Sequence, residues 1–340
     1  GQRYFFISKL ETSFLNSVVD CKTTEYLRYN ITNWSLAVTY KIKDIINYDT
    51  FTKIEPIHKG WSRDEKYYAE KINGEKLLIR VSDISEYDEK KQEFNIMTRM
   101  FDIGIHMPKP ISFGICNNGK SVCQILTWCE GKEAKELLPS LSGQEQYKFG
   151  QKAGQILKEM QQLENCPPSS EWAKIYGAKV KKYIQNYKSC GEILTDDKIL
   201  FSFLEKHFSC LENRPMCLLH GDFQSDNMVI SPNGELYIID FQGSGLVDPY
   251  YALTGTMVTA EISTQFSNGQ LYSYFNGAIP ADFWELNAFY MAAESINAFS
   301  VAVTLGQEEI DYSNKMTKVM LDWFDNFNNL IPNWYIDKKI

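Results

Sequence analysis

The chain has 340 residues, of which 44% are hydrophobic and 14% aromatic, and this composition supplies a large core and excludes a disordered chain. Its formal net charge of −8 excludes a general nucleic-acid binder, because phosphate neutralisation needs clustered Lys and Arg. Beyond residue 240, eleven Asp and Glu stand against four Lys, so most of the negative charge belongs to the C-terminal part. A field of that sign favours a cationic partner.

The eight cysteines are scattered through the chain, which has no C-x-x-C pair and only four His. This spacing predicts neither a zinc site nor a disulfide framework. The sequence shows no signal peptide and no apolar run long enough to span a bilayer. We therefore expect a cytoplasmic protein with reduced cysteines and no membrane association.

The first elements in chain order are short strands. Residues 1–46 show no sustained period and are treated as an N-terminal extension without an assigned role. The region 47–128 then carries strand signals at 51–54 and 76–82, a hairpin turn at Asn73 and Gly74, a charged helix at 86–100, and strands at 111–115 and 122–128. This pattern predicts an antiparallel sheet with one inserted helix.

The region 129–340 shows helical periodicity. One apolar stripe consists of Phe149, Ala153, Ile156, Leu157, Met160 and Leu163, and a second falls between residues 199 and 211. A sheet-rich region followed by a larger, mostly helical one predicts an α+β, bilobal architecture that joins near residues 128–131.

The most informative segment runs from Leu219 to Phe241 and contains Asp222, Asn227 and Asp240. If Asn233 and Gly234 form a two-residue hairpin turn, Asn227 lies opposite Asp240, with Cβ atoms about 4.5–5.5 Å apart. An amide oxygen and a carboxylate converging on one point suit Mg²⁺, which also keeps water and phosphate ligands.

Asp222 lies five residues before Asn227, close enough to accept the proton of an incoming hydroxyl. An isolated Asp-Asn-Asp trio is usually turn chemistry. A strand, a hairpin and three aligned metal-competent residues together favour the catalytic interpretation, with Asp222 as the base and Asn227 and Asp240 as metal ligands. His220 fits either a residue that holds the loop or a participant in chemistry.

The motifs His220-Gly-Asp222, Asn227 and Ile239-Asp-Phe241 resemble the signature of the aminoglycoside phosphotransferase family, which is related to protein kinases and choline kinase. The resemblance runs from about residue 51 to residue 335. It implies a protein-kinase-like fold, with a nucleotide-binding N-lobe at 47–128 and a C-lobe at 129–340 that holds the catalytic loop and substrate-binding helices. It also implies Mg²⁺ and ATP or GTP as co-substrate.

The resemblance further implies nucleotide-binding residues in the N-lobe. Residues 59–67 are similar to the family's nucleotide-covering loop, with Gly60 and Ser62, and residues 77–80 to its phosphate-contacting strand, with Arg80. An ion pair is expected between Arg80 and Glu93, although Glu89 is one turn away on the same helix face. The hinge is expected at Thr127, Trp128 and Cys129.

By the same resemblance, Asp248 is a structural carboxylate, and residues 269–277 and 283–284 belong to the substrate side. The expected acceptor is a hydroxyl of an aminoglycoside antibiotic, which links the protein to antibiotic resistance. The candidate ammonium partners are Glu261, Glu285 and Glu294.

Two other readings remain open. The same chemistry could act on a macrolide, a sugar or a choline-like amino alcohol, for which Trp284, Tyr250 and Tyr251 would supply aromatic faces. The chain could also bind nucleotide without turnover, against which the intact Asp222, Asn227 and Asp240 argue.

Overall fold

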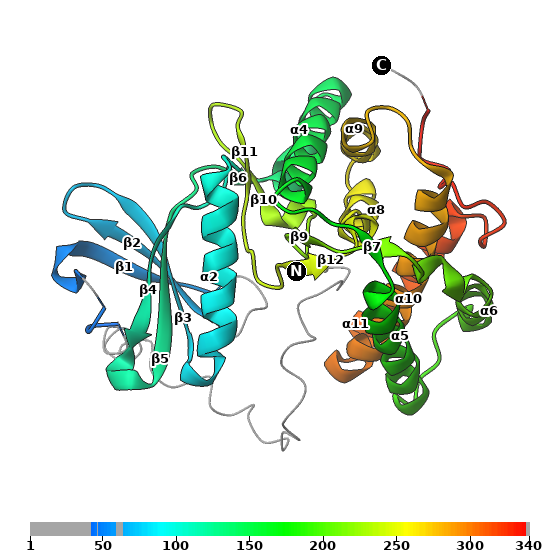
Figure 1. Ribbon diagram of the computed structural model, residues 1–340, viewed down its shortest axis with the longest axis horizontal. Helices are drawn as coiled ribbons and strands as arrows, with labels where there is room; N and C mark the ends of the chain where they lie inside the picture. The colour runs from blue at the N-terminus through cyan, green and yellow to red at the C-terminus, as the bar shows by residue number, and fades with distance from the viewer. Residues whose placement is uncertain (1–41, 46, 59–63, 338–340) are drawn as a thin grey trace. The chain divides into compact units, whose positions relative to one another are not determined.

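The computed structural model describes residues 42–45, 47–58 and 64–337 (Figure 1). Most of the predicted N-terminal extension, and both Gly60 and Ser62, lie outside the described residues. The described chain forms two compact units. The sheet unit holds the described residues up to Glu130 together with Tyr237–Gln242, and the helical unit holds Gly131–Leu236 and residues 243–337.

The sheet unit contains a five-stranded antiparallel sheet in the order β1-β2-β3-β5-β4, with helix α2 running along it (Figure 1). The strands are β1 (Phe51–Ile57), β2 (Glu65–Lys71), β3 (Lys76–Asp83), β4 (Pro110–Cys116) and β5 (Ser121–Thr127), and α2 is Tyr87–Asp102. The predicted antiparallel sheet with one inserted helix is confirmed, and the expected strands and helix match observed ones to within a few residues, but β2 was not predicted and overlaps the expected nucleotide-covering loop at residues 65–67.

The two faces of β3 carry different chemistry because side chains alternate along a strand. Leu77, Ile79 and Val81 join an apolar cluster that also contains Ile42 and Ile45. Arg80, at an intervening position, faces the other way, toward Glu93 of α2. The β2–β3 turn at Asn73 and Gly74 is also confirmed: Gly74 adopts φ +83°, which glycine tolerates without strain.

The helical unit consists of helices and several short strands, which pair as β6 with β10, β9 with β12 and β7 with β8. Its helices are α3 (Ala134–Leu137), α4 (Gly143–Gln161), α5 (Glu171–Ser189), α6 (Asp197–His207), α7 (Pro249–Ala252), α8 (Thr254–Ala260), α9 (Thr264–Tyr274), α10 (Ala281–Leu305) and α11 (Gln307–Trp323). Its strands are β6 (Lys132–Glu133), β7 (Pro168–Ser169), β8 (Arg214–Pro215), β9 (Cys217–Leu219), β10 (Met228–Ile230) and β12 (Gly245–Val247), and β11 (Leu236–Ile238) leads into the sheet unit.

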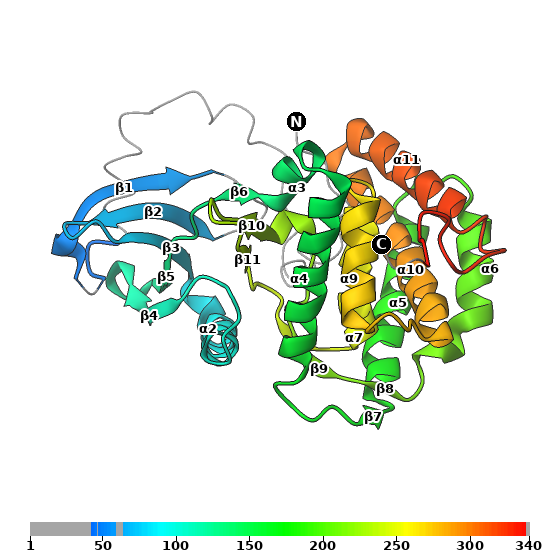
Figure 2. The ribbon, with the colours of Figure 1, turned by 90° about the horizontal axis from the view of Figure 1, so that it is seen from above.

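Helices α4 and α9 lie side by side along their lengths (Figure 2). Glycines allow this approach: a Cβ on Gly150 would lie 1.9 Å from Phe266 O, and one on Gly154 would lie 2.2 Å from Gln270 O. Gly269 of α9 faces the backbone of Tyr147 in the same manner, at 2.1 Å. Backbone therefore packs directly on backbone between these helices.

Helix α10 forms the centre of the helical unit and contacts α5, α6, α7 and α11. Among the described helices it is the one that is long and apolar enough to cross a membrane, which the sequence analysis had not anticipated. In the structure, 78% of its most apolar stretch is buried inside the molecule. Burial of this extent is what a core helix shows.

The turn that precedes β11 differs from the predicted one. Gly234 N–H donates to Ser231 O (2.9 Å), and Ser231 N–H donates to Glu235 O (2.9 Å). The turn therefore centres on Pro232 and Asn233, with Gly234 at φ +78° as a bulge residue, and Ser231 lies opposite Glu235. The predicted two-residue turn at Asn233 and Gly234 was therefore wrong, and the pairing of the two strands that it joins is shifted by one residue from the predicted register.

The cysteines also differ from expectation. Cys166, in the segment after α4, and Cys217, the first residue of β9, are joined by a disulfide with a Cα–Cα distance of 5.4 Å. They are 51 residues apart in the sequence, so only the fold brings them together. The expectation of reduced cysteines was therefore wrong at this pair.

We expect Gly154→Ala to lower the free energy of unfolding by about 1–3 kcal/mol, because its Cβ would overlap the α9 backbone and force the helices apart. Urea unfolding followed by circular dichroism measures this change. The matched control is Gly143→Ala in the same helix, where the nearest atom is a flexible Gln265 side-chain carbon at 3.5 Å. Equal stability of the two variants would contradict the packing argument.

Candidate active site

The segment that follows β9 carries the predicted catalytic loop. His220 is fully buried, and its Nδ1 accepts a hydrogen bond from the Asp222 N–H at 3.3 Å. The Ser244 hydroxyl donates to His220 O at 3.1 Å. Gly221 has φ +82°, and a Cβ there would lie 2.3 Å from Gly243 O. His220 thus holds the shape of the loop. Of the two roles predicted for it, these contacts favour the structural one over participation in chemistry.

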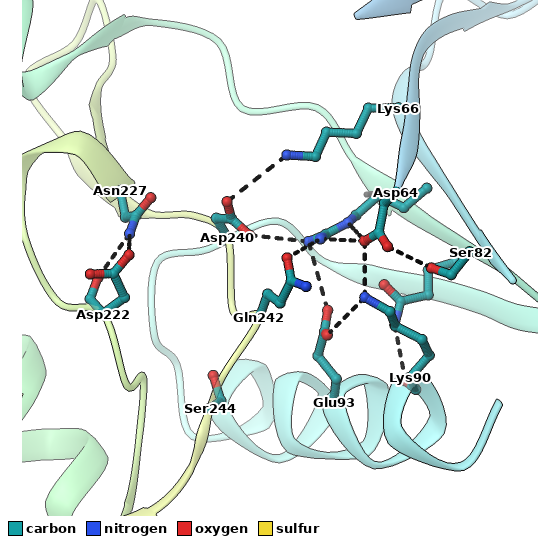
Figure 3. A network of polar contacts seen from close by, with 12 residues as sticks. Asp64, Lys66, Ser82, Lys90, Glu93, Asp222, Asn227, Asp240, Gln242 and Ser244 are labelled. Carbon is teal, nitrogen blue, oxygen red and sulfur yellow. Dashed lines mark hydrogen bonds and ion pairs between the residues drawn. The ribbon is translucent and has the colours of Figure 1, made fainter. Parts of the chain in front are cut away.

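Two side-chain amides orient the Asp222 carboxylate, which is itself buried, and Figure 3 shows the one from Asn227. Asn227 Nδ2 donates to Asp222 Oδ2 at 2.7 Å and to Asp222 O at 2.9 Å. Gln224 Nε2 donates to Asp222 Oδ1 at 2.9 Å. The amide orientation of Asn227 is therefore fixed by its donors, which directs its Oδ1 away from Asp222.

Gln224 is a site residue that the sequence reasoning missed. It is 7% exposed, and among the described residues its Oε1 has no hydrogen-bond partner. A polar side chain two residues from the proposed base was the only available signal, and that signal is weak because Gln is common in loops. Its contact with Asp222 depends on the turn formed by Ser225–Asn227.

Helix α8 packs against the backbone of the predicted catalytic loop. Gly255 packs against the backbone of Phe223, where a Cβ would lie 2.2 Å from the carbonyl oxygen. Thr259 Oγ1 accepts a hydrogen bond from the Ser225 N–H at 3.2 Å and donates to Gly255 O at 2.9 Å. The loop that carries Asp222 is therefore fixed by backbone contacts to a buried helix.

Asp240 belongs to the sheet unit and has a left-handed backbone conformation, with φ +63°. Arg80 NH1 donates to Asp240 Oδ1 at 3.3 Å, and Lys66 Nζ lies 4.0 Å from Asp240 Oδ2 (Figure 3). A carboxylate and an amide oxygen are ligands that Mg²⁺ accepts, so Asp240 and Asn227 fit the predicted metal by donor chemistry. They belong to different units, and their joint coordination stays a prediction.

The shortest ion pair of Arg80 is with a residue that was not predicted from the sequence. Asp64 Oδ2 accepts from Arg80 NH2 at 2.6 Å and from Arg80 Nε at 3.1 Å. Glu93, the predicted partner, lies 3.7 Å from Arg80 NH1. Glu89, the alternative, is exposed. The Arg80–Glu93 pair is thus present, but the Asp64 carboxylate makes the shorter contacts.

Lys90 completes this network. Its ammonium is fully buried, 3.0 Å from Asp64 Oδ2 and 3.8 Å from Glu93 Oε2. Lys90 and Glu93 are three residues apart on α2 and share its buried face with Met97 and Met100. Charged residues on an otherwise apolar helix stripe were a signal that could have identified Lys90.

Asp64 and Glu93 of this network have pKa values shifted in opposite directions. Burial alone would raise the pKa of Asp64, but the charges of Arg80 and Lys90 and the hydroxyl of Ser82 lower it to about 2. Burial instead raises the pKa of Glu93, against the opposing effect of Arg80 and Lys90. The two buried cations therefore stabilise Asp64 more than Glu93.

The predicted hinge follows β5. Thr127 N–H donates to Lys109 O and Trp128 N–H donates to Lys76 O, both at 3.0 Å. The Trp128 ring packs edge-on against Tyr68, with ring centroids 5.0 Å apart. Cys129 is half-buried, and burial raises the pKa of its thiol to about 12. The first two hinge N–H groups are thus bonded within the sheet unit.

The three carboxylates predicted to contact the acceptor lie in different surroundings within the helical unit. Glu294 is fully buried and accepts hydrogen bonds from Tyr176, Tyr183 and Tyr251. Glu285 contacts His207 Nδ1 at 2.8 Å. Glu261 is exposed at the C-terminal end of α8, the helix that supports the catalytic loop.

The aromatic residues considered for a quaternary amine are used inside the fold. The Tyr250 ring lies 4.1 Å from the Arg214 guanidinium carbon, and Trp284 is buried against Tyr335. Asp248 is structural, as expected: it is fully buried, accepts hydrogen bonds from Arg214 and Tyr290, and caps α7.

Comparison with protein families decides the classification. The model of the phosphotransferase enzyme family, APH, matches residues 53–286, which is more than half of the chain and includes the catalytic loop. The chain belongs to the phosphotransferase enzyme family. The resemblance inferred from the sequence is thereby confirmed, and so is the assignment of the protein as a phosphotransferase. No curated protein matches the chain.

Solved structures with this fold include three small-molecule kinases or kinase relatives. A thermostable mutant of aminoglycoside phosphotransferase APH(4)-Ia, in a ternary complex with AMP-PNP and hygromycin B, has a TM-score of 0.60 at 12% identity over 82% of this chain and 96% of that chain. The GDP complex of aminoglycoside 2'-phosphotransferase-IIIa has a TM-score of 0.61 at 13% identity, covering 86% and 98%. A choline/ethanolamine kinase family protein from Mesorhizobium loti has a TM-score of 0.62 at 13% identity, covering 87% and 97%. The predicted protein-kinase-like α+β fold is confirmed.

We expect Asp64→Asn to lower the free energy of unfolding of this phosphotransferase by about 3 kcal/mol at pH 7, because it leaves Arg80 and Lys90 buried with less negative charge. The folded pKa of Asp64 is depressed, so its contribution is present above about pH 4 and is lost as the pH falls toward 2. Urea unfolding of both proteins from pH 7 to pH 3 measures the difference, which should shrink at the acidic end. The control is Glu89→Gln, which removes an exposed carboxylate of the same unit and should cost less than about 0.5 kcal/mol.

Proposed function

We propose that the protein transfers the γ-phosphoryl group of ATP or GTP to a hydroxyl of a small molecule, with Mg²⁺. The observation that carries this proposal is the buried Asp222 carboxylate, held by the amides of Gln224 and Asn227 on a loop fixed to α8. A base fixed in this way is oriented before the acceptor arrives, so little reorganisation is needed in the transition state.

In this proposal each site residue has one role. Asp222 orients the acceptor hydroxyl and accepts its proton. Asn227, through Oδ1, and Asp240 would hold Mg²⁺, which neutralises phosphate charge when bound. Arg80 fixes the Asp240 carboxylate, and Glu93 and Asp64 fix Arg80. The base of the nucleotide would be bound by the hinge at Thr127, Trp128 and Cys129. The N–H groups of Thr127 and Trp128 are already bonded within the sheet unit, and the Cys129 main chain comes next in the hinge.

We propose an aminoglycoside as the acceptor. The excess of acidic residues beyond residue 240 supports a polycation with many hydroxyls. Of the three candidate carboxylates, Glu261 is the one we retain for the acceptor, since it is exposed and lies within electrostatic range of Lys135 and Asp226 beside the catalytic loop. Glu285 and Glu294 already contact His207 and three tyrosines, respectively. Such an activity would confer antibiotic resistance and, because it uses nucleoside triphosphates, would take place in the cytoplasm.

A choline-like amine is the second acceptor class. Its support is the fold shared with the choline/ethanolamine kinase family protein, whereas the engagement of Tyr250 and Trp284 inside the fold argues against it. Macrolides and sugars complete the acceptor panel.

The deciding experiment measures release of nucleoside diphosphate from Mg-ATP and Mg-GTP in the presence of aminoglycosides, macrolides, sugars and choline. We expect acceptor-dependent turnover with an aminoglycoside, and we expect Asp222→Asn to reduce kcat by about 10²–10⁴-fold because it removes the base. The variant should retain nucleotide affinity, measured by calorimetry. Nucleotide binding without acceptor-dependent release across the panel would overturn the proposed function.

Metal removal provides an independent check. We expect EDTA to abolish turnover and added Mg²⁺ to restore it, with Asn227→Ala requiring a higher Mg²⁺ concentration because one of two protein ligands is lost. Glu235→Gln, an exposed-loop substitution near the hairpin turn, is the control and should leave the Mg²⁺ dependence unchanged. Full activity in EDTA would exclude the metal role.

A further inference from the structure

The Asp248 carboxylate is buried at the corner between β12 and α7. It is fully shielded from solvent, and its Oδ1 caps α7 by accepting a hydrogen bond from the Tyr250 N–H at 2.7 Å. Tyr290 of α10 donates to Asp248 Oδ2 at 3.0 Å, and the Tyr290 hydroxyl accepts from Trp172 Nε1 of α5 at 2.8 Å. Three helices therefore converge on this one carboxylate.

Arg214 of β8 supplies the positive charge at the corner. Its Nε donates to Asp248 Oδ2 at 2.6 Å, and its NH2 donates to Asp248 Oδ1 at 3.1 Å. The guanidinium carbon lies 4.1 Å from the centroid of the Tyr250 ring, and NH1 lies 3.4 Å from Asp282 Oδ2 in the first turn of α10. Two parallel hydrogen bonds fix both the distance and the orientation of the carboxylate, which a single ammonium would not do.

The corner stands at one end of the strand pair that carries the catalytic loop. β12 runs antiparallel to β9, and Leu219, the last residue of β9, lies opposite Gly245. The loop with Asp222 follows Leu219 directly, whereas Asp248 follows Val247 at the opposite end of the pairing. The ion pair at the corner thus anchors the ladder whose other end presents the proposed base.

The second support of the catalytic loop starts from the same corner. Asp248 caps α7, and Leu253 joins α7 directly to α8. Gly255 of α8 lies against the backbone of the loop, and Thr259 Oγ1 accepts a hydrogen bond from the Ser225 N–H at 3.2 Å. The place of α8, and with it that of the loop backbone, therefore depends on how α7 leaves the corner.

We propose that Arg214 is a positioning residue for Asp222, because it fixes the corner at Asp248 from which both supports of the loop start. This rests on the proposed function for the role of Asp222 as the base. Without the guanidinium, Asp248 is a buried charge that has lost its cation, so the corner loosens. Asp222 then spends less time in its reactive orientation, and a displacement of about 1 Å can lower a rate about 10²-fold.

The experiment compares Arg214→Met with the wild type, using Mg-ATP and the aminoglycoside that the wild type phosphorylates. We expect kcat to fall about tenfold or more, with KM for Mg-ATP changed less than about threefold, because the loop loses its orientation while the sheet unit is untouched. Arg214→Lys keeps the charge but not the two-point contact, and should have an intermediate kcat. Rates are measured at a temperature at which thermal unfolding shows each variant to be folded.

Hydrogen–deuterium exchange gives a readout that does not depend on activity. We expect the amides of residues 217–226 to exchange faster in Arg214→Met than in the wild type, and the amides of α11, which contributes no side chain to the corner, to be unchanged. If Arg214→Met does not fold, Arg214→Lys carries the same comparison with a smaller expected difference.

The matched control is Lys174→Met, which removes the exposed ion pair of Lys174 with Glu171, at 2.7 Å, from the helix that also carries Trp172. It should keep the kcat and the exchange pattern of the wild type. Wild-type kcat in the Arg214 variants would reduce the ion pair to a purely structural one and overturn the proposal. Exchange that rises equally in the loop and in α11 would overturn it too, since that pattern marks a loss of overall stability.

These outcomes are separable from the proposed function. If the wild type phosphorylates no acceptor, the proposed function fails, and the exchange comparison still decides whether Arg214 fixes the loop. If the wild type turns over and the Arg214 variants keep its kcat, the reaction stands and the positioning role of Arg214 is overturned.

Discussion

The sheet unit depends on one buried interaction, the ion pair between the Arg80 guanidinium and the Asp64 carboxylate. Burying these charges is favourable only because each is satisfied several times, Asp64 by Arg80, Lys90 and Ser82, and Arg80 also by Asp240. The network connects β3, α2 and the segment after β11. It therefore fixes the carboxylate proposed as a metal ligand to β3, the central strand of the sheet.

In the helical unit, the proposed base Asp222 is held in place directly by backbone contacts and hydrogen bonds and not by a buried ion pair. Gly255 and Thr259 of α8 contact the backbone of the catalytic loop, and Gln224 and Asn227 orient Asp222 by hydrogen bonds. Close backbone contacts recur where α4 meets α9, so glycine sets the helix spacing in this unit. Each unit thus presents one half of the proposed chemistry on a preorganised support.

Much of the candidate site could be predicted because local signals coincided. Strand alternation, the turn at Asn73 and Gly74 and the spacing of Asp222 and Asn227 are signals that act over a few residues. The structure has a strand, a turn and a loop at these positions, as expected. The hairpin before Asp240 was wrong by one residue, since a bulge at Gly234 has nearly the same sequence signal as a two-residue turn. Asp64 and Lys90 were missed because their contact joins elements that are far apart in the sequence, and Gln224 was missed because Gln is common in loops.

The sequence by itself determined the fold class, the family and the identity of the residues proposed for chemistry, since these follow from short-range spacing and from the family's motifs. The tertiary structure decided which charges pair. It gave Arg80 the partner Asp64 in addition to Glu93, buried Glu294 among tyrosines, and joined Cys166 to Cys217. The physical reason is that burial and charge pairing are set by distances between segments far apart in the chain, and one-dimensional spacing carries no record of those distances.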